Sequence, residues 1–259
     1  LERVREKSLA GSSPVSSAMR VIFLNIWQGK MEAGLLEFIK KNSSNTDIFC
    51  FQELSRDVRN KVKKVLTDHE LIYFSRIWKI DNRKVFLGQG MFIRKNKLHI
   101  MLSNRKNLYK KTSEEPHGFL QFAEVKNGAG NFIIGNIHGK AFPSNKFDSD
   151  IRIKQSKNII KTLKSFGMPS IFGGDFNLDL NTESVKMFEE EGYRNLIKDH
   201  KVKTTRNNLA WDNFKNRKGF FKQYFADYVF ISPEIKVNSF EVPSIEISDH
   251  LPLILDFEI

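Results

Sequence analysis

The chain has 259 residues, of which 40% are hydrophobic and 28% are charged, and its formal net charge is +12. This composition is typical of a soluble globular protein and excludes a disordered or collagen-like chain. The single cysteine excludes an intrachain disulfide framework and any cysteine-rich zinc or iron–sulfur site, and no apolar run approaches the roughly 20 residues of a membrane-spanning helix.

The first 18 residues differ in character from the rest of the chain. They combine charged residues with a Gly/Ser-rich run at residues 11–17, and they lack the apolar core of a secretory signal. Met19 directly precedes the first strand-like run. We therefore expect residues 1–18 to be a disordered or non-native extension and residues 19–259 to form a single domain.

Strand and helix patterns alternate at the start of this domain. Mostly apolar runs at residues 21–27 and 47–51 are typical of strands that are buried on both faces. Apolar residues at helical spacing predict helices over residues 31–41 and 55–68, and each of these helices follows one of the two strands.

The middle of the chain is richer in strands. Strand patterns occur at residues 71–74, 85–93, 98–102, 119–125 and 131–137. Between the last two, Lys126-Asn127-Gly128 is a hairpin-turn signal, so we expect these strands to pair with each other.

The last part of the chain returns to alternating elements. Helices are predicted over residues 148–165 and 183–191, and strands over residues 170–172, 227–231 and 253–257. No internal repeat occurs at the periods of solenoid proteins. Several successive strands between helices favour mixed sheets that are covered by helices, in one domain.

Polar residues stand at the ends of these buried strands, where loops commonly build functional sites. Asn25 lies within the first strand, and Glu53 directly follows the second. The other candidates are Asn136 and His138, Asp175 and Asn177, Asp227, and Asp249 and His250. Each has a structural alternative, since a glutamate suits a helix N-terminus and Gly-Gly-Asp is an ordinary turn composition. Their occurrence together on successive strand ends favours a functional site.

Six short motifs carry these polar residues in chain order. They are Leu24-Asn25-Ile26-Trp27, Phe51-Gln52-Glu53, Gly135-Asn136-Ile137-His138, Gly173-Gly174-Asp175-Phe176-Asn177, Ala226-Asp227-Tyr228 and Ser248-Asp249-His250-Leu251-Pro252-Leu253. As an ordered set that spans residues 20–259, they resemble the endonuclease/exonuclease/phosphatase superfamily. The resemblance implies an α/β fold (α+β mixed), a four-layer sandwich of two mixed β-sheets flanked by helices, with one catalytic domain over residues 19–259.

The resemblance also implies a metal-assisted site for phosphoester hydrolysis. Glu53 would bind a divalent cation, with Asn25 and Asp249 beside it. Hard carboxylate and amide oxygens suit Mg²⁺ or Mn²⁺, which keep several water ligands. A cation of this kind neutralises the charge that builds on the phosphoryl oxygens during hydrolysis.

The remaining site residues would act on the water and the phosphate. By the same resemblance, Asp175 would orient or deprotonate the attacking water, and Asn177 would hold this water or a phosphate oxygen. His250 would contact the phosphate and would be oriented by Asp227. His138 would be a second phosphate contact or a general acid. A carboxylate beside an imidazole fixes its tautomer and favours its cationic form, which suits an anionic phosphorane.

Departures from the superfamily pattern bear on the branch to which the chain is most similar. Trp27-Gln28 replaces the Asp-Gly of apurinic endonucleases, and the motif around Asp175 lacks the Tyr-Arg of inositol-polyphosphate phosphatases. The Asn-x-Trp opening is similar to that of sphingomyelinase-like and bacterial members. Arg152 and Gln155 also match the superfamily pattern, and we expect them to be structural supports.

The charge of +12 and an isoelectric point near 9.6 favour a polyanionic partner, such as nucleic acid, an anionic membrane surface or a phosphorylated metabolite. The alternative is that the lysines only solvate the surface, because no block of five or six like charges occurs. The candidate phosphate contacts are Lys61, Lys63, Lys64, Lys201, Lys203 and Arg206.

We therefore predict a divalent-metal-dependent phosphodiester hydrolase that acts as a nuclease on DNA or RNA through attack of an activated water. The alternative is a hydrolase of phospholipid headgroups, similar to sphingomyelinases, or of small phosphate esters. A lipid substrate would need an exposed apolar rim at the site. No protein partner is inferred, and we expect a monomer. One cysteine and no secretory signal favour the cytoplasm.

Overall fold

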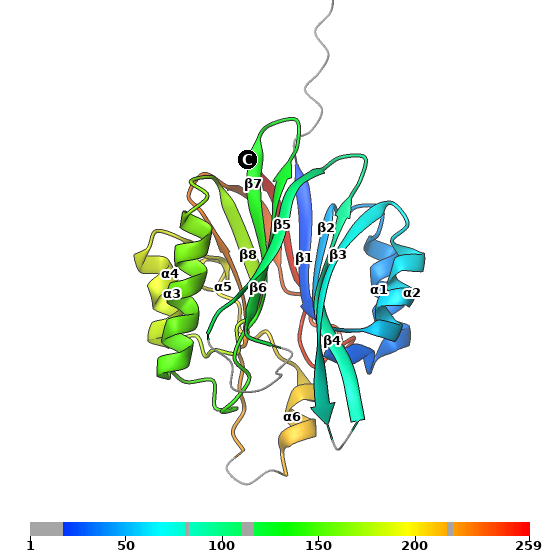
Figure 1. Ribbon diagram of the computed structural model, residues 1–259. Coiled ribbons are helices and arrows are strands. Elements are labelled where there is room, and N and C mark those ends of the chain that lie inside the picture. Colours follow the sequence, from blue (N-terminus) through cyan, green and yellow to red (C-terminus); the bar gives the residue numbers. More distant parts are fainter. Residues whose placement is uncertain (1–17, 81–82, 110–116, 217–219) are drawn as a thin grey trace, which may run out of the picture.

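Two six-stranded β-sheets pack face to face, and helices cover the outer face of each sheet (Figure 1). The computed structural model describes residues 18–80, 83–109, 117–216 and 220–259. Its four layers are the sandwich that the motifs predict. Apart from its last residue, the predicted N-terminal extension lies outside the described residues.

The strand order makes both sheets mixed. The first sheet contains, from edge to edge, β11 (Lys236–Glu241), β12 (Leu253–Glu258), β1 (Met19–Asn25), β2 (Ile48–Ser55), β4 (Arg83–Arg94) and β3 (His69–Ile80). The second contains β5 (His99–Asn107), β6 (Phe119–Lys126), β7 (Asn131–His138), β8 (Ser170–Asp175), β10 (Asp227–Ile231) and β9 (Arg194–Asn195). The β1–β2 and β7–β8 pairs are parallel, and the other pairs of described strands are antiparallel.

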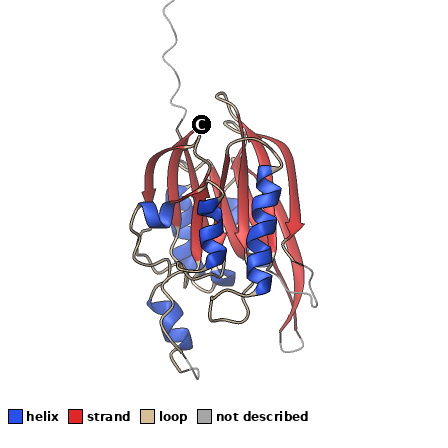
Figure 2. Ribbon diagram, turned by 90° about the vertical axis from the view of Figure 1, so that its left-hand side faces the viewer, coloured by secondary structure: helices blue, strands red, loops and turns tan. Residues whose placement is uncertain are grey.

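Four helices form the outer layers. They are α1 (Glu32–Asn42) and α2 (Arg56–Val65) on the first sheet, and α3 (Asp150–Lys164) and α4 (Glu183–Glu190) on the second. Figure 2 shows the second pair lying in front of the strands that they cover. None of the helices in the described part of the chain is long and apolar enough to cross a membrane.

The apolar run in β1 explains why this strand is central. Val21 and Phe23 belong to the core between the two sheets, whereas Ile22 and Leu24 pack in the cluster that contains the apolar residues of α1 and α2. Successive side chains of a strand point to opposite faces, so a strand that is covered on both sides needs apolar residues at every position.

The strand register places the predicted site residues at one edge of the molecule. In the parallel β7–β8 pair His138 lies opposite Asp175, and in the antiparallel β8–β10 pair Asp175 lies opposite Asp227. Asn25 and Glu53 stand at the matching ends of β1 and β2 in the other sheet. The carboxyl ends of β1, β2, β7 and β8 therefore meet at the lower end of the molecule in Figure 1.

A buried amide network joins the two sheets and includes one of the sequence candidates. Asn136 is fully buried, and its Oδ1 accepts a hydrogen bond from Gln52 Nε2 over 2.6 Å. Its Nδ2 donates to Gln121 Oε1 over 3.1 Å, and its backbone oxygen accepts from Gln89 Nε2 over 2.7 Å. Gln52 and Gln89 belong to the first sheet, and Asn136 and Gln121 to the second. The role of Asn136 in this structure is thus to tie the sheets together.

Short elements with little apolar patterning escape prediction from the sequence. The edge strand β11 carries one buried hydrophobic residue, Phe240, and pairs with β12 alone. Four more unpredicted elements are the 3₁₀ turn η1 (Trp27–Gly29), the strand β9 and the helices α5 (Leu196–Asp199) and α6 (Asn208–Phe214). Elements of this size bury too few side chains to produce a detectable hydrophobic periodicity in the sequence.

Candidate functional site

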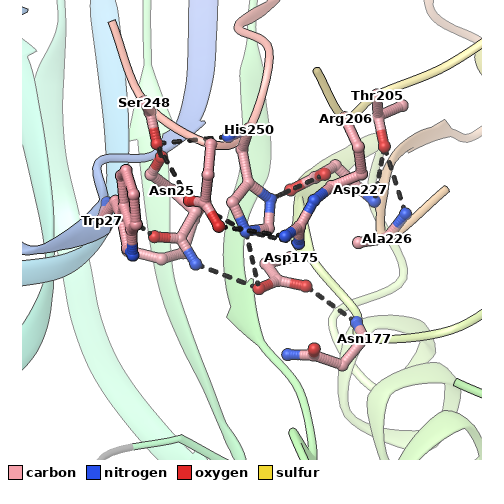
Figure 3. Close-up of polar contacts among 12 residues, drawn as sticks. Asn25, Trp27, Asp175, Asn177, Thr205, Arg206, Ala226, Asp227, Ser248 and His250 are labelled. Carbon is pink, nitrogen blue, oxygen red and sulfur yellow. Dashed lines mark hydrogen bonds and ion pairs between the residues drawn. The ribbon is translucent and has the colours of Figure 1, made fainter. Parts of the chain in front are cut away.

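Asn25 connects the two sheets at the site edge (Figure 3). Its Nδ2 lies 3.3 Å from Glu53 Oε1 and 3.0 Å from Asp175 Oδ2, and its Oδ1 accepts the backbone N–H of Trp27 over 3.0 Å. A backbone N–H only donates, so the amide oxygen faces Trp27 and the amide nitrogen faces the carboxylates. In this arrangement Asn25 draws together one carboxylate from each sheet, and its contact with a metal ion stays a prediction.

Glu53 is the most accessible carboxylate of the site. Its side chain is 21% exposed, against 3% for Asp175. It lies where the β2–β4 register is interrupted, and its Oε2 accepts a hydrogen bond from Gln28 Nε2 over 3.3 Å. The interruption turns this side chain out of the ladder and toward Asn25 and Gln28.

His250 and Asp227 form a buried pair (Figure 3). His250 Nδ1 lies 2.9 Å from both carboxylate oxygens of Asp227, so this nitrogen carries the proton. Burial and Arg206 lower the pKa of His250, but the nearby carboxylates, Asp227 first, outweigh them and raise it above its usual value. Burial in turn raises the pKa of Asp227 against the influence of His250.

Arg206 lies inside the site and not on the solvated surface. It is 7% exposed, and its Nη1 lies 2.9 Å from His250 Nε2 while its Nη2 lies 3.0 Å from Asp249 Oδ2. Lys201 and Lys203, which the sequence groups with it, are both exposed. Since a guanidinium only donates, the contact with His250 requires the neutral form of the ring, and protonation of His250 must release Arg206.

Asp175 is buried among positive groups. Burial would raise its pKa, but the surrounding basic groups outweigh burial and hold it well below its usual range. These groups are, in order of effect, His250, Lys146, His138 and Arg206. Its Oδ1 accepts the backbone N–H of Asn177 over 2.9 Å. Asp175 is therefore ionised at neutral pH and fixed by hydrogen bonds on both oxygens.

His138 stands between the carboxylates of the two sheets. Its Nε2 lies 3.9 Å from Glu53 Oε1 and 3.8 Å from Asp175 Oδ2, and its ring meets the His117 ring edge-on at 5.7 Å. With this residue, the structure brings together all eight sequence candidates for catalysis and metal binding. They are Asn25, Glu53, His138, Asp175, Asn177, Asp227, Asp249 and His250.

Unusual backbone conformations gather at the site. Among the described non-glycine residues, six have a positive φ, and five of these surround the cluster. They are Trp27, Gln28, Glu53, Lys146 and Asn177, with φ between 47° and 61°. Such conformations cost of order 1–3 kcal/mol each and persist where the surroundings enforce them, often at functional sites. Gln28 and Lys146 are site residues that carry no motif signal and that the sequence did not predict.

The two supports expected on the long helix hold the loops around the site. Gln155 Oε1 accepts the backbone N–H of Lys140 over 2.8 Å, and its Nε2 donates to the Phe176 oxygen over 3.3 Å. Arg152 is fully buried and donates to the Phe147 oxygen over 2.6 Å. α3 thus fixes the segments that follow β7 and β8.

The donor set fits a hard divalent cation. Four carboxylates gather at the site, those of Glu53, Asp175, Asp227 and Asp249. Arg206 pairs with Asp249 and His250 with Asp227, which leaves Glu53 and Asp175 without a direct ion pair of that kind among the described residues. Carboxylate oxygens are the ligands that Mg²⁺ and Mn²⁺ prefer. Asp175, Asp227 and His250 offer ligand atoms within 4.8 Å of one another. Both ring nitrogens of His250 are taken by partners, whereas each carboxylate oxygen of Glu53 and Asp175 has a further lone pair, so these two residues are the better-placed donors.

Comparisons with known proteins identify the family and the fold. The model of the Endonuclease/Exonuclease/phosphatase family matches residues 22–250, and no curated protein sequence matches the chain.

Solved structures share the fold at low sequence identity. An endonuclease/exonuclease/phosphatase from Bacteroides vulgatus is 21% identical, with a TM-score of 0.72, over 93% of this chain and 99% of that one. A mannosyl-6-phosphatase from Bacteroides thetaiotaomicron is 17% identical, with a TM-score of 0.69, over 93% of this chain and 100% of that one. The TDP2 of D. rerio complexed with a single-strand DNA product is 16% identical, with a TM-score of 0.69, over 94% and 100%.

Proposed function

Because the chain belongs to the Endonuclease/Exonuclease/phosphatase family, whose members are hydrolytic phosphoesterases, we propose that it is a divalent-metal-dependent phosphodiesterase that cleaves DNA or RNA. The observation that carries the proposal is the junction of Asn25, Glu53 and Asp175, which joins the two sheets. The His250–Asp227 pair stands beside it, with His250 Nε2 at 3.8 Å from Asp175 Oδ2.

The protein's own groups account for positioning of the water and the phosphate. The lowered pKa of Asp175 makes it a weak base, so it orients the attacking water more than it deprotonates it. Asp227 accepts the Nδ1–H of His250, so once Arg206 moves aside, Nε2 takes up a proton and can donate a hydrogen bond to a phosphoryl oxygen. The Arg206 guanidinium can then pair with a second oxygen of the phosphoryl group.

Glu53 and Asp175 would hold the divalent cation, with Asp249 nearby. A bound Mg²⁺ or Mn²⁺ supplies charge neutralisation on the phosphoryl oxygens and at the departing oxygen. His138, 3.9 Å from Glu53 and 3.8 Å from Asp175, is placed to give a proton to that oxygen as the ester bond breaks.

An exposed aromatic rim beside the site supports a nucleic-acid substrate. It consists of Phe142, Phe147, Phe221 and Tyr224, which are 43–52% exposed. The segments that carry them are linked by a hydrogen bond from Gln223 Nε2 to the Ser144 oxygen. His117 contacts the rings of both His138 and Phe142, so the rim reaches the site. Exposed rings stack with unpaired bases, and a net charge of +12 attracts the phosphate backbone.

The same rim favours a second candidate function. A hydrolase of phospholipid headgroups needs exposed apolar side chains that enter the lipid surface, and Phe142 and Phe147 meet that need. A sphingomyelinase-like activity is therefore the alternative to nuclease activity at this site.

Hydrolysis by the purified full chain distinguishes the two candidates. With Mg²⁺ or Mn²⁺ present, we expect cleavage of plasmid DNA or RNA, a steep fall of nucleic-acid affinity with salt, and loss of cleavage in Asp175→Asn. Sphingomyelin vesicles and inositol phosphates serve as competing substrates in the same assay. Turnover that is restricted to the vesicles would establish the lipid candidate and reject the nuclease.

A further inference from the structure

Lys146 is a buried lysine in the segment between β7 and α3, and the roles assigned above do not use it. It is 5% exposed, and its Nζ donates to Asn177 Oδ1 over 2.7 Å. Among the described residues no carboxylate oxygen lies within 4.0 Å of this ammonium group. A buried ammonium group that makes no direct ion pair contributes little to stability, and its charge lies near Asp175, so a role at the site accounts for it better.

The backbone around Lys146 is held firmly enough to place its side chain. Lys146 has a φ of 61°, and its oxygen accepts the backbone N–H of Asp179 over 2.8 Å. On either side, Arg152 donates to the oxygens of Pro143 over 2.5 Å and of Phe147 over 2.6 Å. These bonds enforce a conformation that a lysine rarely adopts, and they aim its ammonium group at the segment that follows β8.

The contact determines which way the Asn177 carboxamide is turned. An ammonium group only donates, so the atom that faces Lys146 must be the amide oxygen, and the amide nitrogen must point elsewhere. The backbone of Asn177 is fixed in turn, because its N–H donates to Asp175 Oδ1 over 2.9 Å. Figure 3 shows the Asn177 side chain beside Asp175, at the site where the phosphate is expected.

We propose that Lys146 is a positioning residue that orients the Asn177 carboxamide, so that Asn177 Nδ2 donates a hydrogen bond to the phosphoryl group in the transition state. The inference rests on the proposed phosphoesterase function. Lys146 also places a positive charge near Asp175, which helps to keep that carboxylate ionised. Without Lys146, the Asn177 carboxamide is free to rotate, and either its Nδ2 donor or its Oδ1 acceptor can face the phosphate.

A double-mutant cycle tests the proposal in the full-length protein. We expect Lys146→Met to lower kcat for phosphodiester cleavage by at least about 10-fold with little change in KM, because a transition-state donor is lost. Asn177→Ala lowers kcat at least as much, and the combined variant is no worse than Asn177→Ala alone. The control is Lys154→Met, which removes an exposed lysine of α3 and leaves kcat unchanged.

Stability separates positioning from a structural role. Lys146→Met keeps the apolar stem and removes a buried charge that makes no direct ion pair, so we expect its Tm to equal or exceed that of the wild type. A wild-type kcat in Lys146→Met would overturn the proposal. So would kcat losses of the two single variants that multiply in the double variant, or a fall in kcat accompanied by a matching fall in Tm.

A readout without catalysis keeps the inference separate from the proposed function. The side-chain amide resonances of Asn177, observed by ¹⁵N NMR in the full chain, shift in Lys146→Met if the two groups are bonded. Unshifted resonances would overturn the inference. A wild type that hydrolyses no phosphate ester would instead overturn the proposed function, and the amide resonances would then decide the Lys146–Asn177 coupling by themselves.

Discussion

At the scale of single residues, the site is a network in which each carboxylate has a defined partner. Asn25 joins Glu53 to Asp175, and Asp227 fixes His250. Polar residues at the ends of apolar strands made these positions predictable, because a buried strand rarely ends on carboxylates and amides without a use for them. Arg206 and Lys146 could not be placed at the site from the sequence. They lie in loops, where no hydrophobic periodicity indicates the direction of a side chain.

The pair between Arg206 and Asp249 gives a stability prediction. Both side chains are more than nine-tenths buried, at 8% and 6% exposure. We expect Arg206→Ala to lower the free energy of unfolding by about 3–5 kcal/mol, because it leaves a buried carboxylate unpaired. Urea denaturation in the presence of a chelator measures the change without stabilisation by bound cations.

A surface pair supplies the control for that experiment. Lys236 pairs with Glu258 over 3.1 Å, but its side chain is 69% exposed. Lys236→Ala is expected to change the free energy of unfolding by less than about 1 kcal/mol. If Arg206→Ala lowered the free energy of unfolding by as little as Lys236→Ala, the buried Arg206–Asp249 pair would not stabilise the fold as predicted.

At the scale of elements, the parallel pairs β1–β2 and β7–β8 direct four strand ends to one edge, and the long apolar strands made this part of the fold predictable. The edge strand β11 was missed because only one of its six residues is buried. The strand β12 is held to β1 by a bidentate ion pair, in which Arg20 Nε and Nη2 lie 2.6 Å and 2.7 Å from the two Asp256 oxygens.

This ion pair predicts a pH-dependent contribution to stability. The hydrogen bonds from Arg20 lower the pKa of Asp256 in the folded state below its ordinary value of 3.8. The stabilisation is therefore present above that value and is lost as the pH falls through the folded-state pKa. Asp256→Asn should destabilise the protein at pH 7, and the difference from wild type should shrink below pH ~4.

Urea denaturation of wild type and Asp256→Asn at neutral and at acid pH checks this. An equal difference in the free energy of unfolding at both pH values would show that the charge of Asp256 is not what stabilises the β1–β12 pair.

At the scale of the whole molecule, the chain combines a net charge of +12 with an exposed aromatic rim beside the candidate phosphoesterase site. Composition alone could show the charge but not the rim, since Phe142, Phe147, Phe221 and Tyr224 are 82 positions apart at most and meet only through the folding of two loops. The charge and the rim both bear on which substrate would reach the site, whereas the cluster of carboxylates and histidines carries the proposed hydrolysis.

The most direct test of that central claim is the rate of DNA cleavage during removal and return of Mg²⁺, for the wild type, Glu53→Gln and His250→Ala. We predict that chelation abolishes cleavage by the wild type, that Mg²⁺ restores it, and that Glu53→Gln requires more Mg²⁺. His250→Ala should lose about 100-fold or more in rate while it keeps its fold by circular dichroism. Undiminished cleavage by the chelated wild type or by His250→Ala would contradict the account.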